Sequence, residues 1–409
     1  MTPPAGGRRV VVTGLGIVCA LGADQRQVWG AMMEGRSGIG ALGLFDATGC
    51  LSDRAAEVKR LPDLPGLPAP ERARASRSDL LCLAAAREAA AQAGLTRDGM
   101  ASIGISLGSS TAGMLETEEY VRRGESRGFD RAGVSRILGL PSSAPADAVA
   151  RDLRAGGPRL SNMTACASSA ISIGLAADLI RAGDATGMIA GGGDALCRLT
   201  YSGFNTLRLL DSSPCRPFDA SRQGLSLGEG AGILVLEEAD TARRRGAAVL
   251  AEFLDYGLSC DAHHMTAPHP DGRGAASAMT QALERSGITP ETIDHVNLHG
   301  TGTSLNDATE ARALRTVFGQ AGRMPSATAS KSMIGHLLGG AGAVEAVVLV
   351  LTLLHQKIPP TLGWERADEG TSLDLVHGAA RREEMRLAIS NSFGFGGSNA
   401  SLVFRRGAA

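Results

Sequence analysis

The chain has 409 residues, of which 44% are hydrophobic, and its 41 Lys and Arg nearly balance its 42 Asp and Glu. A chain of this length can bury large cores and can form two domains or one fused pair. The balanced charge excludes a bulk attraction to nucleic acid or to a membrane surface, so an acidic partner would have to bind a local basic patch. We expect no apolar run of the roughly eighteen residues that span a bilayer, and no signal peptide. The expected location is cytoplasmic.

Helices and strands alternate along the chain, which predicts the α/β class. Two segments repeat one layout, a helix followed by a strand and a small polar run, and each half later closes on an apolar strand. The repeated segments are 85–111 and 278–301, and the closing strands are 233–236 and 401–404. We therefore predict a duplicated fold with halves 1–245 and 246–409, joined near the charged segment that ends at Arg245.

Cys166 directly precedes the segment 168–181, whose apolar residues recur at helical spacing before Gly183. A thiol at a helix N-terminus experiences the positive end of the helix dipole and unpaired N–H groups, and we expect both to lower its pKa. The same N–H groups can stabilise an oxyanion on an attacked thioester carbonyl. The alternative is that Cys166 is a small buried hydrophobe, as most free cysteines are.

Two histidines lie in contexts that suit a site. His299 ends an apolar, strand-like stretch and is followed by Gly300-Thr301-Gly302-Thr303. His336 lies in a glycine-rich segment before the apolar helix predicted over 344–354. Either histidine alone would be read as a satisfied core residue. Together with Cys166 they indicate a thiolate nucleophile with two imidazoles brought to it by folding.

Other motifs suggest no further chemistry. The seven cysteines are scattered and odd in number, which argues against a disulfide framework. His263, His264 and His269 lie near Asp261, but their spacing fits no common metal-ligand pattern, and we expect neither a metal nor another cofactor. The segment 224–228 matches the G-x-S-x-G nucleophile elbow of serine hydrolases, yet it leads into glycines and a strand instead of a helix.

The motifs around Cys166, His299 and His336 resemble those of the beta-ketoacyl-ACP synthases, the condensing enzymes of fatty-acid and polyketide synthesis. The likeness runs from Arg9-Val10-Val11-Val12-Thr13-Gly14-Leu15-Gly16 to Asn391-Ser392-Phe393-Gly394-Phe395-Gly396-Gly397-Ser398-Asn399. Several independent motifs in the same order make this a specific signal. The resemblance implies the thiolase-like duplicated fold, with five layers in the order α-β-α-β-α, and a homodimer.

The resemblance also implies roles for individual residues. Cys166 would attack the acyl thioester, the backbone N–H groups of Cys166 and Phe395 would form the oxyanion hole, and His299 and His336 would stabilise the enolate of the second substrate. Lys331, held by Asp307 and Glu345, would tune the histidines or only brace the loop. Thr301 and Thr303 would bind the phosphopantetheine arm, Phe395 would gate the acyl pocket, and Phe204 and Thr111 would line that pocket. The acyl carrier protein (ACP) would bind a basic rim, for which the candidates are Arg72, Arg74, Arg77, Arg122, Arg123, Arg127 and Arg208.

The implied reaction is a decarboxylative Claisen condensation. An enzyme-bound acyl group from acyl-ACP and malonyl-ACP would give 3-oxoacyl-ACP, carbon dioxide and free ACP, in fatty-acid or polyketide elongation. The alternative is the ketosynthase subunit of a specialised type II polyketide system that needs a chain-length-factor partner, because the Gly302 motif has the spelling common in polyketide synthases.

Three related readings fit less well. A non-catalytic condensing partner would lack the nucleophilic cysteine, a thiolase would need a cysteine after Cys260, and an initiating synthase would have Asn in place of His336.

Overall fold

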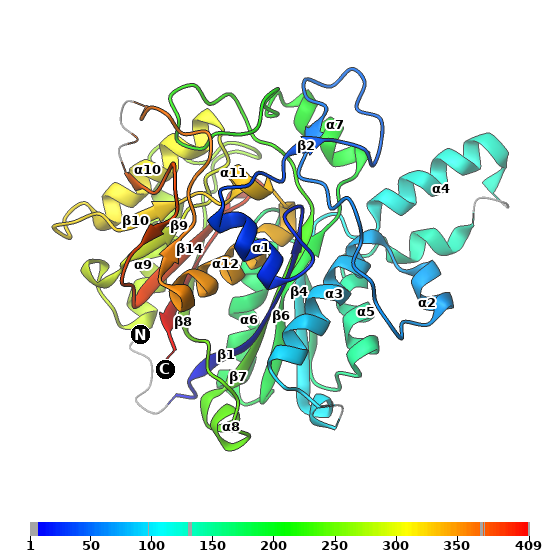
Figure 1. Cartoon of the computed structure of the whole chain (residues 1–409), viewed down its shortest axis with the longest axis horizontal. Helices are drawn as coiled ribbons and strands as arrows, with labels where there is room; N and C mark the ends of the chain where they lie inside the picture. Colours follow the sequence, from blue (N-terminus) through cyan, green and yellow to red (C-terminus); the bar gives the residue numbers. More distant parts are fainter. Residues whose placement is uncertain (1–6, 97, 130–132, 369–370, 372, 408–409) are drawn as a thin grey trace.

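Two similar halves make up the fold, and each is built on a mixed β-sheet (Figure 1). The structure is a computed structural model that describes residues 7–96, 98–129, 133–368, 371 and 373–407. The strand order is β5-β4-β6-β7-β1 in the first half and β12-β10-β9-β14-β15-β8 in the second. The strands are β1 (Val10–Cys19), β4 (Ile103–Gly108), β5 (Arg159–Asn162), β6 (Gly187–Asp194), β7 (Gly230–Glu238), β8 (Ala251–Cys260), β9 (His295–Asn297), β10 (Ser326–Thr328), β12 (Asp374–Leu375), β14 (Leu387–Phe393) and β15 (Ser398–Arg406).

The strand order confirms the predicted duplication. In each half the first strand, β1 or β8, lies innermost and next to the last strand, β7 or β15. β1 and β8 pair antiparallel over three residues, with Val10 opposite Phe253, and so connect the two sheets. The predicted junction at Arg245 follows α8 (Ala239–Arg244) and precedes β8, and this boundary stays a prediction.

Helices form three layers around the two sheets. α6 (Ser168–Ala182) and α12 (Ala341–His355) lie between the sheets and share one core with β1, β7 and β15. α3 (Arg77–Gln92) and α5 (Ala144–Leu153) cover the outer face of the first sheet. α9 (Arg273–Ser286) and α10 (Ser304–Phe318) cover that of the second. The layers are those of the thiolase-like α-β-α-β-α fold.

The shorter helices and strands lie outside these five layers or connect them. Figure 1 shows α4 projecting from the body of the molecule beside α2, with α7 at the opposite end of the molecule from α8. The remaining helices are α1 (Gln25–Met33), α2 (Ala69–Arg74), α4 (Met114–Arg127), α7 (Arg198–Thr206) and α11 (Lys331–Ile334), with the 3-10 turns η1 (Gly99–Ser102), η3 (Val134–Gly139), η4 (Pro290–Thr292), η5 (Leu338–Gly340) and η6 (Phe395–Gly397). The remaining strands are the pairs β2 (Gly40–Ala41) with β3 (Arg54–Ala55) and β11 (Lys357–Ile358) with β13 (Arg381–Arg382).

The two central helices position the site. α6 begins two residues after Cys166 and ends at Gly183, whose φ of +88° and N–H bonds to the Leu179 and Ile180 carbonyls close the helix. α12 begins five residues after His336 and is buried on all sides from Ala341 to Leu353, where it is apolar apart from Glu345 and Thr352, as expected for a helix between two sheets. The residues that precede both helices therefore meet at one place between the halves.

Both central helices correct the expectation about apolar runs. The stretches 165–182 and 338–355 are long and apolar enough to cross a membrane, although no such run was expected. In the folded chain 61% of the first stretch and 89% of the second are buried. They are the inner layer of the fold, and their length and composition follow from that burial.

Candidate active site

Cys166 lies in the turn between β5 and α6. The residue before it, Ala165, has a φ of 49°, in the left-handed region, and its carbonyl accepts hydrogen bonds from the N–H and hydroxyl of Ser168 at 3.1 and 2.6 Å. A non-glycine residue in this region is strained, and the strain persists only where neighbouring contacts fix it. The turn directs the Cys166 thiol, in a residue only 5% exposed, into a pocket between the halves.

The Cys166 thiol contacts the imidazole of His336, with Sγ 3.0 Å from Nε2. Burial raises the pKa of Cys166 to about 11, although Lys331 and the backbone N–H groups of Phe395 and Cys166 act in the opposite direction. Burial, and to a smaller extent the charge of Lys331, holds the pKa of His336 well below its usual range. The resting pair is thus a neutral thiol that donates to a neutral imidazole. The expected lowering of the thiol pKa is wrong, because desolvation outweighs the helix terminus.

His299 follows β9 and faces the same pocket, with its ring centre 5.4 Å from that of His336. Lys331, buried at the start of α11, donates to Glu345 Oε1 at 2.5 Å and to the His299 carbonyl at 2.6 Å, and it lies 3.3 Å from His299 Nδ1. An ammonium group has no acceptor, so Nδ1 accepts and the ring proton lies on Nε2. Burial, followed by Lys331 and His336, lowers the pKa of His299 well below its usual range. His299 therefore presents a neutral N–H donor.

The partners of Lys331 differ in one respect from the expected set. Glu345 contacts Lys331 as expected, and burial raises the pKa of Glu345 to about 7. Asp307 does not contact Lys331: its carboxylate accepts from the N–H groups of Phe218 at 2.7 Å and Gly302 at 3.2 Å and lies 3.6 Å from Arg222. Asp307 therefore fixes the loop that carries Thr301 and Thr303.

Glu310 is a buried acid of this site that the sequence reasoning missed. Its two carboxylate oxygens accept from the N–H groups of His299 and Gly300, each at 2.8 Å. Burial raises the pKa of Glu310 to about 7. The signal that could have found it is spacing, because Glu310 lies three residues after Asp307 on α10 and both face the loop that starts at His299.

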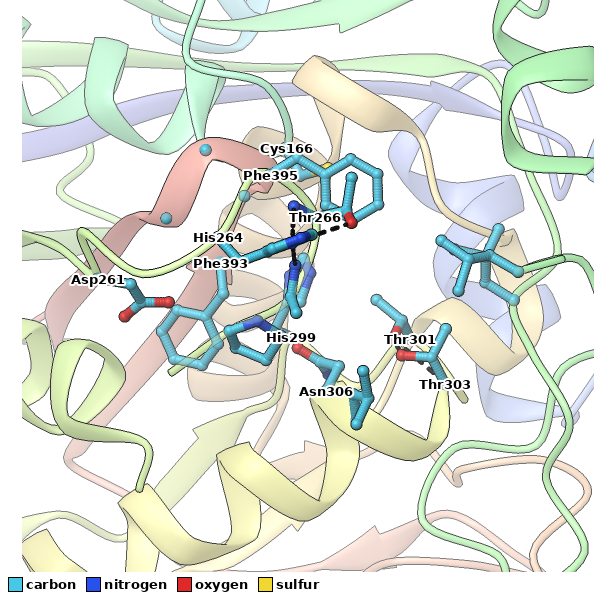
Figure 2. A pocket seen from close by; sticks show the side chains of 18 of the residues that line it. Cys166, Asp261, His264, Thr266, His299, Thr301, Thr303, Asn306, Phe393 and Phe395 are labelled. Carbon is cyan, nitrogen blue, oxygen red and sulfur yellow. Dashed lines mark hydrogen bonds between the residues drawn. The ribbon is translucent and has the colours of Figure 1, made fainter. Parts of the chain in front are cut away.

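A pocket with a cavity volume of about 130 Å³ leads to Cys166, His299 and His336. Figure 2 shows Thr301 and Thr303 side by side on its wall, and their hydroxyl oxygens are 2.9 Å apart. Both hydroxyls can donate or accept hydrogen bonds with a group in the pocket. Sequence reasoning assigned several lining residues no place in the pocket, although it weighed His264 and the segment with Leu225 for other roles: Leu209, Leu225, His264, Met265, Thr266, Leu305 and Asn306.

Phe395 lies beside the thiol and against the wall of the pocket. Its N–H contacts the Cys166 sulfur, and its ring stacks on Phe204 with centres 5.5 Å apart. Phe204 lines the pocket, as expected. Thr111 is not among the lining residues: its hydroxyl oxygen lies 3.0 Å from Asp194 Oδ1 and 3.1 Å from the Ala195 carbonyl oxygen, and its one proton is donated to either acceptor. The hydroxyl therefore points into a buried polar contact, away from the pocket.

The seven candidate arginines do not form one rim. Arg208 is exposed and directly precedes Leu209 of the pocket wall. Arg77 is instead a partly buried partner of Glu229, with Nη2 2.6 Å from Oε1 and a side chain 12% exposed, so its placement argues against a docking role. The others are on α2 and α4: Arg72 donates to the Leu64 carbonyl, Arg122 and Arg123 pair with Glu119, and Arg74 and Arg127 are exposed.

The histidines near Asp261 have local hydrogen-bond roles. His264 Nδ1 accepts from the N–H groups of Thr266 and Ala267 at 3.1 and 3.3 Å. Asp261 accepts from Asn399 at 3.0 Å and from the His269 N–H at 3.2 Å. Over the described residues, no group of three or more potential metal ligands is found.

The neutral resting pair predicts how Cys166 reacts with a simple alkylating agent. Because the pKa of Cys166 is raised to about 11, the thiolate fraction and hence the rate of alkylation by iodoacetamide should still increase tenfold per pH unit between pH 7 and pH 9. Peptide mapping of the alkylated protein gives the rate at Cys166 alone. A rate that levels off below pH 8 would contradict the neutral thiol.

A buried thiol and two imidazoles with perturbed pKa values line one pocket, and a buried lysine lies behind one of the imidazoles, an arrangement that suits nucleophilic and acid–base chemistry. The comparisons with known proteins agree. The model of the beta-ketoacyl synthase N-terminal domain matches residues 7–242, and that of the C-terminal domain matches residues 250–365.

Curated relatives include the 3-oxoacyl-[acyl-carrier-protein] synthase 2 of Synechocystis sp., 38% identical over 98% of both chains, and that of Vibrio cholerae, 38% identical over 98% of this chain and 99% of the relative. Solved structures include the ishigamide ketosynthase/chain length factor, 35% identical with a TM-score of 0.92, and a beta-ketoacyl synthase from Burkholderia phymatum, 32% identical with a TM-score of 0.91. Each covers 98% of this chain and is itself covered in full.

The chain belongs to the beta-ketoacyl synthase family. It is an acyltransferase that catalyses the condensation of chain elongation, with an acyl carrier protein as the carrier of its substrates.

Proposed function

We propose that Cys166 carries the growing acyl chain and that His336 is its proton acceptor. The observation that supports this best is the 3.0 Å contact between Sγ and Nε2 inside the pocket. When Sγ attacks the thioester carbonyl of acyl-ACP, the thiol proton passes to Nε2 and from there to the departing sulfur of the carrier. The N–H groups of Cys166 and Phe395, which lie at the sulfur, would donate to the oxyanion.

The second half of the reaction uses the imidazoles as donors. Once Sγ carries the acyl group it no longer donates to Nε2 of His336, so this ring can hold its proton on Nε2. Loss of carbon dioxide from malonyl-ACP leaves an enolate whose oxygen accepts from Nε2–H of His299 and from Nε2–H of His336. The enolate carbon attacks the acyl carbonyl on Cys166, the C–S bond breaks, and the released thiolate takes up one proton from solvent, which restores the neutral thiol. Thr301 and Thr303 would bind the phosphopantetheine arm on the wall of the pocket.

Intact-protein mass tests this assignment. The protein is incubated with acyl-ACPs of different chain lengths, and malonyl-ACP is then added. The expected result is a protein that gains the acyl mass and loses it as 3-oxoacyl-ACP, and the chain that loads best reports the size of the acyl pocket. A protein that no acyl-ACP loads would contradict the assignment of Cys166, unless a second subunit restores loading.

Arg208 is the arginine that we propose as a docking contact for the acidic carrier. It is exposed beside the pocket wall, where a positive charge attracts an acidic protein arriving with its arm extended. We expect Arg208→Glu to raise the KM for acyl-ACP by about tenfold, with a weaker effect at high salt. Transfer from a small acyl thioester without the protein should be unchanged.

A matched control is Arg243→Glu, the same charge change on α8, at the other end of the molecule from α7 (Figure 1). It should leave the KM for acyl-ACP unchanged. Equal effects of both variants would mean that the carrier responds to net charge alone, and would contradict a docking role for Arg208.

The edge of the first sheet supports a second copy of the chain as a partner. β5 ends the strand series, and no described strand pairs with its outer side. Apolar side chains lie exposed around it, with Met163 at 63% and Leu138 at 64%, and Ser161 Oγ joins β5 to the segment after Leu140 through the Ser142 carbonyl. Such an edge is a template for strand pairing, so we propose a homodimer through β5.

A chain-length factor is the alternative partner, since one solved relative is a ketosynthase/chain length factor. The mass of the purified chain, measured by light scattering, distinguishes a homodimer from a chain that needs a different partner. Wild type should have the mass of a dimer, and Met163→Arg should reduce it to that of a monomer. A wild-type monomer that loads no acyl group would instead favour the heterodimer.

A further inference from the structure

Asp194, at the end of β6, is a fully buried carboxylate outside the mechanism described above. It accepts hydrogen bonds from two separate segments of the chain. Gly339, in η5, donates its N–H to Oδ2 at 2.7 Å. The other donors follow β4: Ser109 Oγ at 2.6 Å, the Ser110 N–H at 2.9 Å, the Thr111 N–H at 2.8 Å, Thr111 Oγ1 at 3.0 Å and the Ala112 N–H at 3.3 Å.

One of these segments leads to the nucleophile. Ser110, whose N–H contacts Asp194, donates its hydroxyl to the Ala165 carbonyl at 3.1 Å. Ala165 is the strained residue directly before Cys166, with a φ of 49°. Asp194 is therefore connected to the Cys166 turn through a single side chain.

The other segment leads to the proton acceptor. Gly339 follows His336 by three residues, and the backbone of His336 is held from the opposite direction, by its N–H to the Ser226 carbonyl at 2.7 Å. The contact at Gly339 is close: a Cβ there would lie 2.7 Å from Asp194 Oδ2 and from Ser110 Oγ. One carboxylate thus fixes the backbone that carries each member of the Cys166–His336 pair.

The charge of Asp194 does not favour the reactive form of the thiol. Three groups that ionise or carry charge act on Cys166: His336 in contact, Lys331, which lowers its pKa, and Asp194, which raises it. A buried carboxylate is costly to desolvate, and this one is offset by its many donors. Its position is therefore explained by the backbone that it holds, and not by electrostatic activation.

We propose that Asp194 is a positioning residue for acyl transfer, which sets the separation between Cys166 Sγ and His336 Nε2 by joining the turn after β4 to the segment before α12. It touches neither substrate nor the reacting atoms. Its effect is exerted through Ser110 and Ala165 on one side and through Gly339 on the other.

The test compares two reactions of Cys166 in Asp194→Asn. The amide keeps the shape of the side chain but turns an NH2 group toward backbone donors, which breaks at least one of these contacts. Acyl transfer from acyl-ACP needs Cys166 Sγ and His336 Nε2 to be aligned. Its rate should fall by on the order of 100-fold, which is the effect expected when reacting groups are displaced by about 1 Å. Alkylation by iodoacetamide needs only thiolate and access, and its pH profile should shift to lower pH because the neighbouring negative charge is gone.

Glu88→Gln is the matched control. Glu88 on α3 also accepts from two backbone N–H groups of other segments, those of Ile17 and Gln25 at 2.9 and 2.8 Å. The variant should lose thermal stability but keep the wild-type ratio of acyl transfer to alkylation. A similar fall in transfer in both variants, or a parallel fall of transfer and alkylation in Asp194→Asn, would overturn the proposal.

Ser110→Ala tests the same positioning role if Asp194→Asn does not fold. It removes only the hydroxyl that contacts the Ala165 carbonyl. Acyl transfer should fall by about three- to tenfold, and the pH profile of alkylation should stay that of wild type, since no charge has changed. Unchanged transfer in Ser110→Ala would show that the connection has no effect on the pair.

Discussion

Replacing Cys166 by alanine should abolish acyl loading while leaving decarboxylation of malonyl-ACP in place. The Cys166 thiol lies in the pocket in contact with the His336 imidazole, and the proposed acyl carrier is lost with it, so condensation should fall by at least about 10³-fold. The donor that stabilises the enolate is a separate group, because Lys331 fixes the His299 tautomer with no contribution from Cys166. Intact-protein mass measures loading, and release of labelled carbon dioxide measures decarboxylation.

The reciprocal variant is His299→Ala. It keeps the Cys166–His336 pair and should therefore still load an acyl group, but decarboxylation should fall by about 10² to 10³-fold with the loss of one donor. If both variants lose both half-reactions to the same extent, the thiol and the imidazole do not act as separate groups, and the division of roles is wrong.

Residues whose role depends on local sequence could be predicted well. The apolar spacing of 168–181 and the stop at Gly183 are properties of one segment, and they gave the helix that begins behind Cys166. The repeat of helix, strand and polar run gave the duplication, because each half buries the same pattern. The meeting of Cys166 with His336 follows from the central layer in which both of their helices lie.

The partners of the buried carboxylates could not be predicted from the sequence, because they depend on how distant segments fold together. Asp307 and Glu310 are one helical turn apart, and only the path of the loop from His299 decides that Asp307 binds Phe218 and Gly302 while Glu310 binds His299 and Gly300. The prediction of a lowered pKa for the Cys166 thiol was wrong for a similar reason, because the burial that raises this pKa arises only when the two halves are assembled. The sequence also does not show that Arg77 pairs with Glu229, because the two residues lie far apart in the chain.

The second large effect concerns Lys331. Lys331→Met removes the cation but leaves Glu345, which is fully buried, without its partner. Breaking a buried pair in this way costs roughly 3 to 5 kcal/mol of stability. Burial already raises the pKa of Glu345 from 4.5 to about 7, and Lys331 opposes that rise, so its removal raises the pKa further. A raised carboxyl pKa favours folding at low pH, so the variant should lose stability as pH rises from about 5 to 8, which thermal unfolding across this range would show.

Activity should respond separately from stability. Without Lys331, no ammonium holds Nδ1 of His299 as an acceptor, the ring is free to take the other tautomer, and decarboxylation should fall by on the order of 100-fold. The double variant Lys331→Met/Glu345→Gln removes the unpaired charge and should recover most of the stability, because a neutral pair replaces a broken ionic one. Decarboxylation should stay low in the double variant. If it recovers together with the melting temperature, Lys331 only braces the loop, and the tautomer of His299 is set by something else.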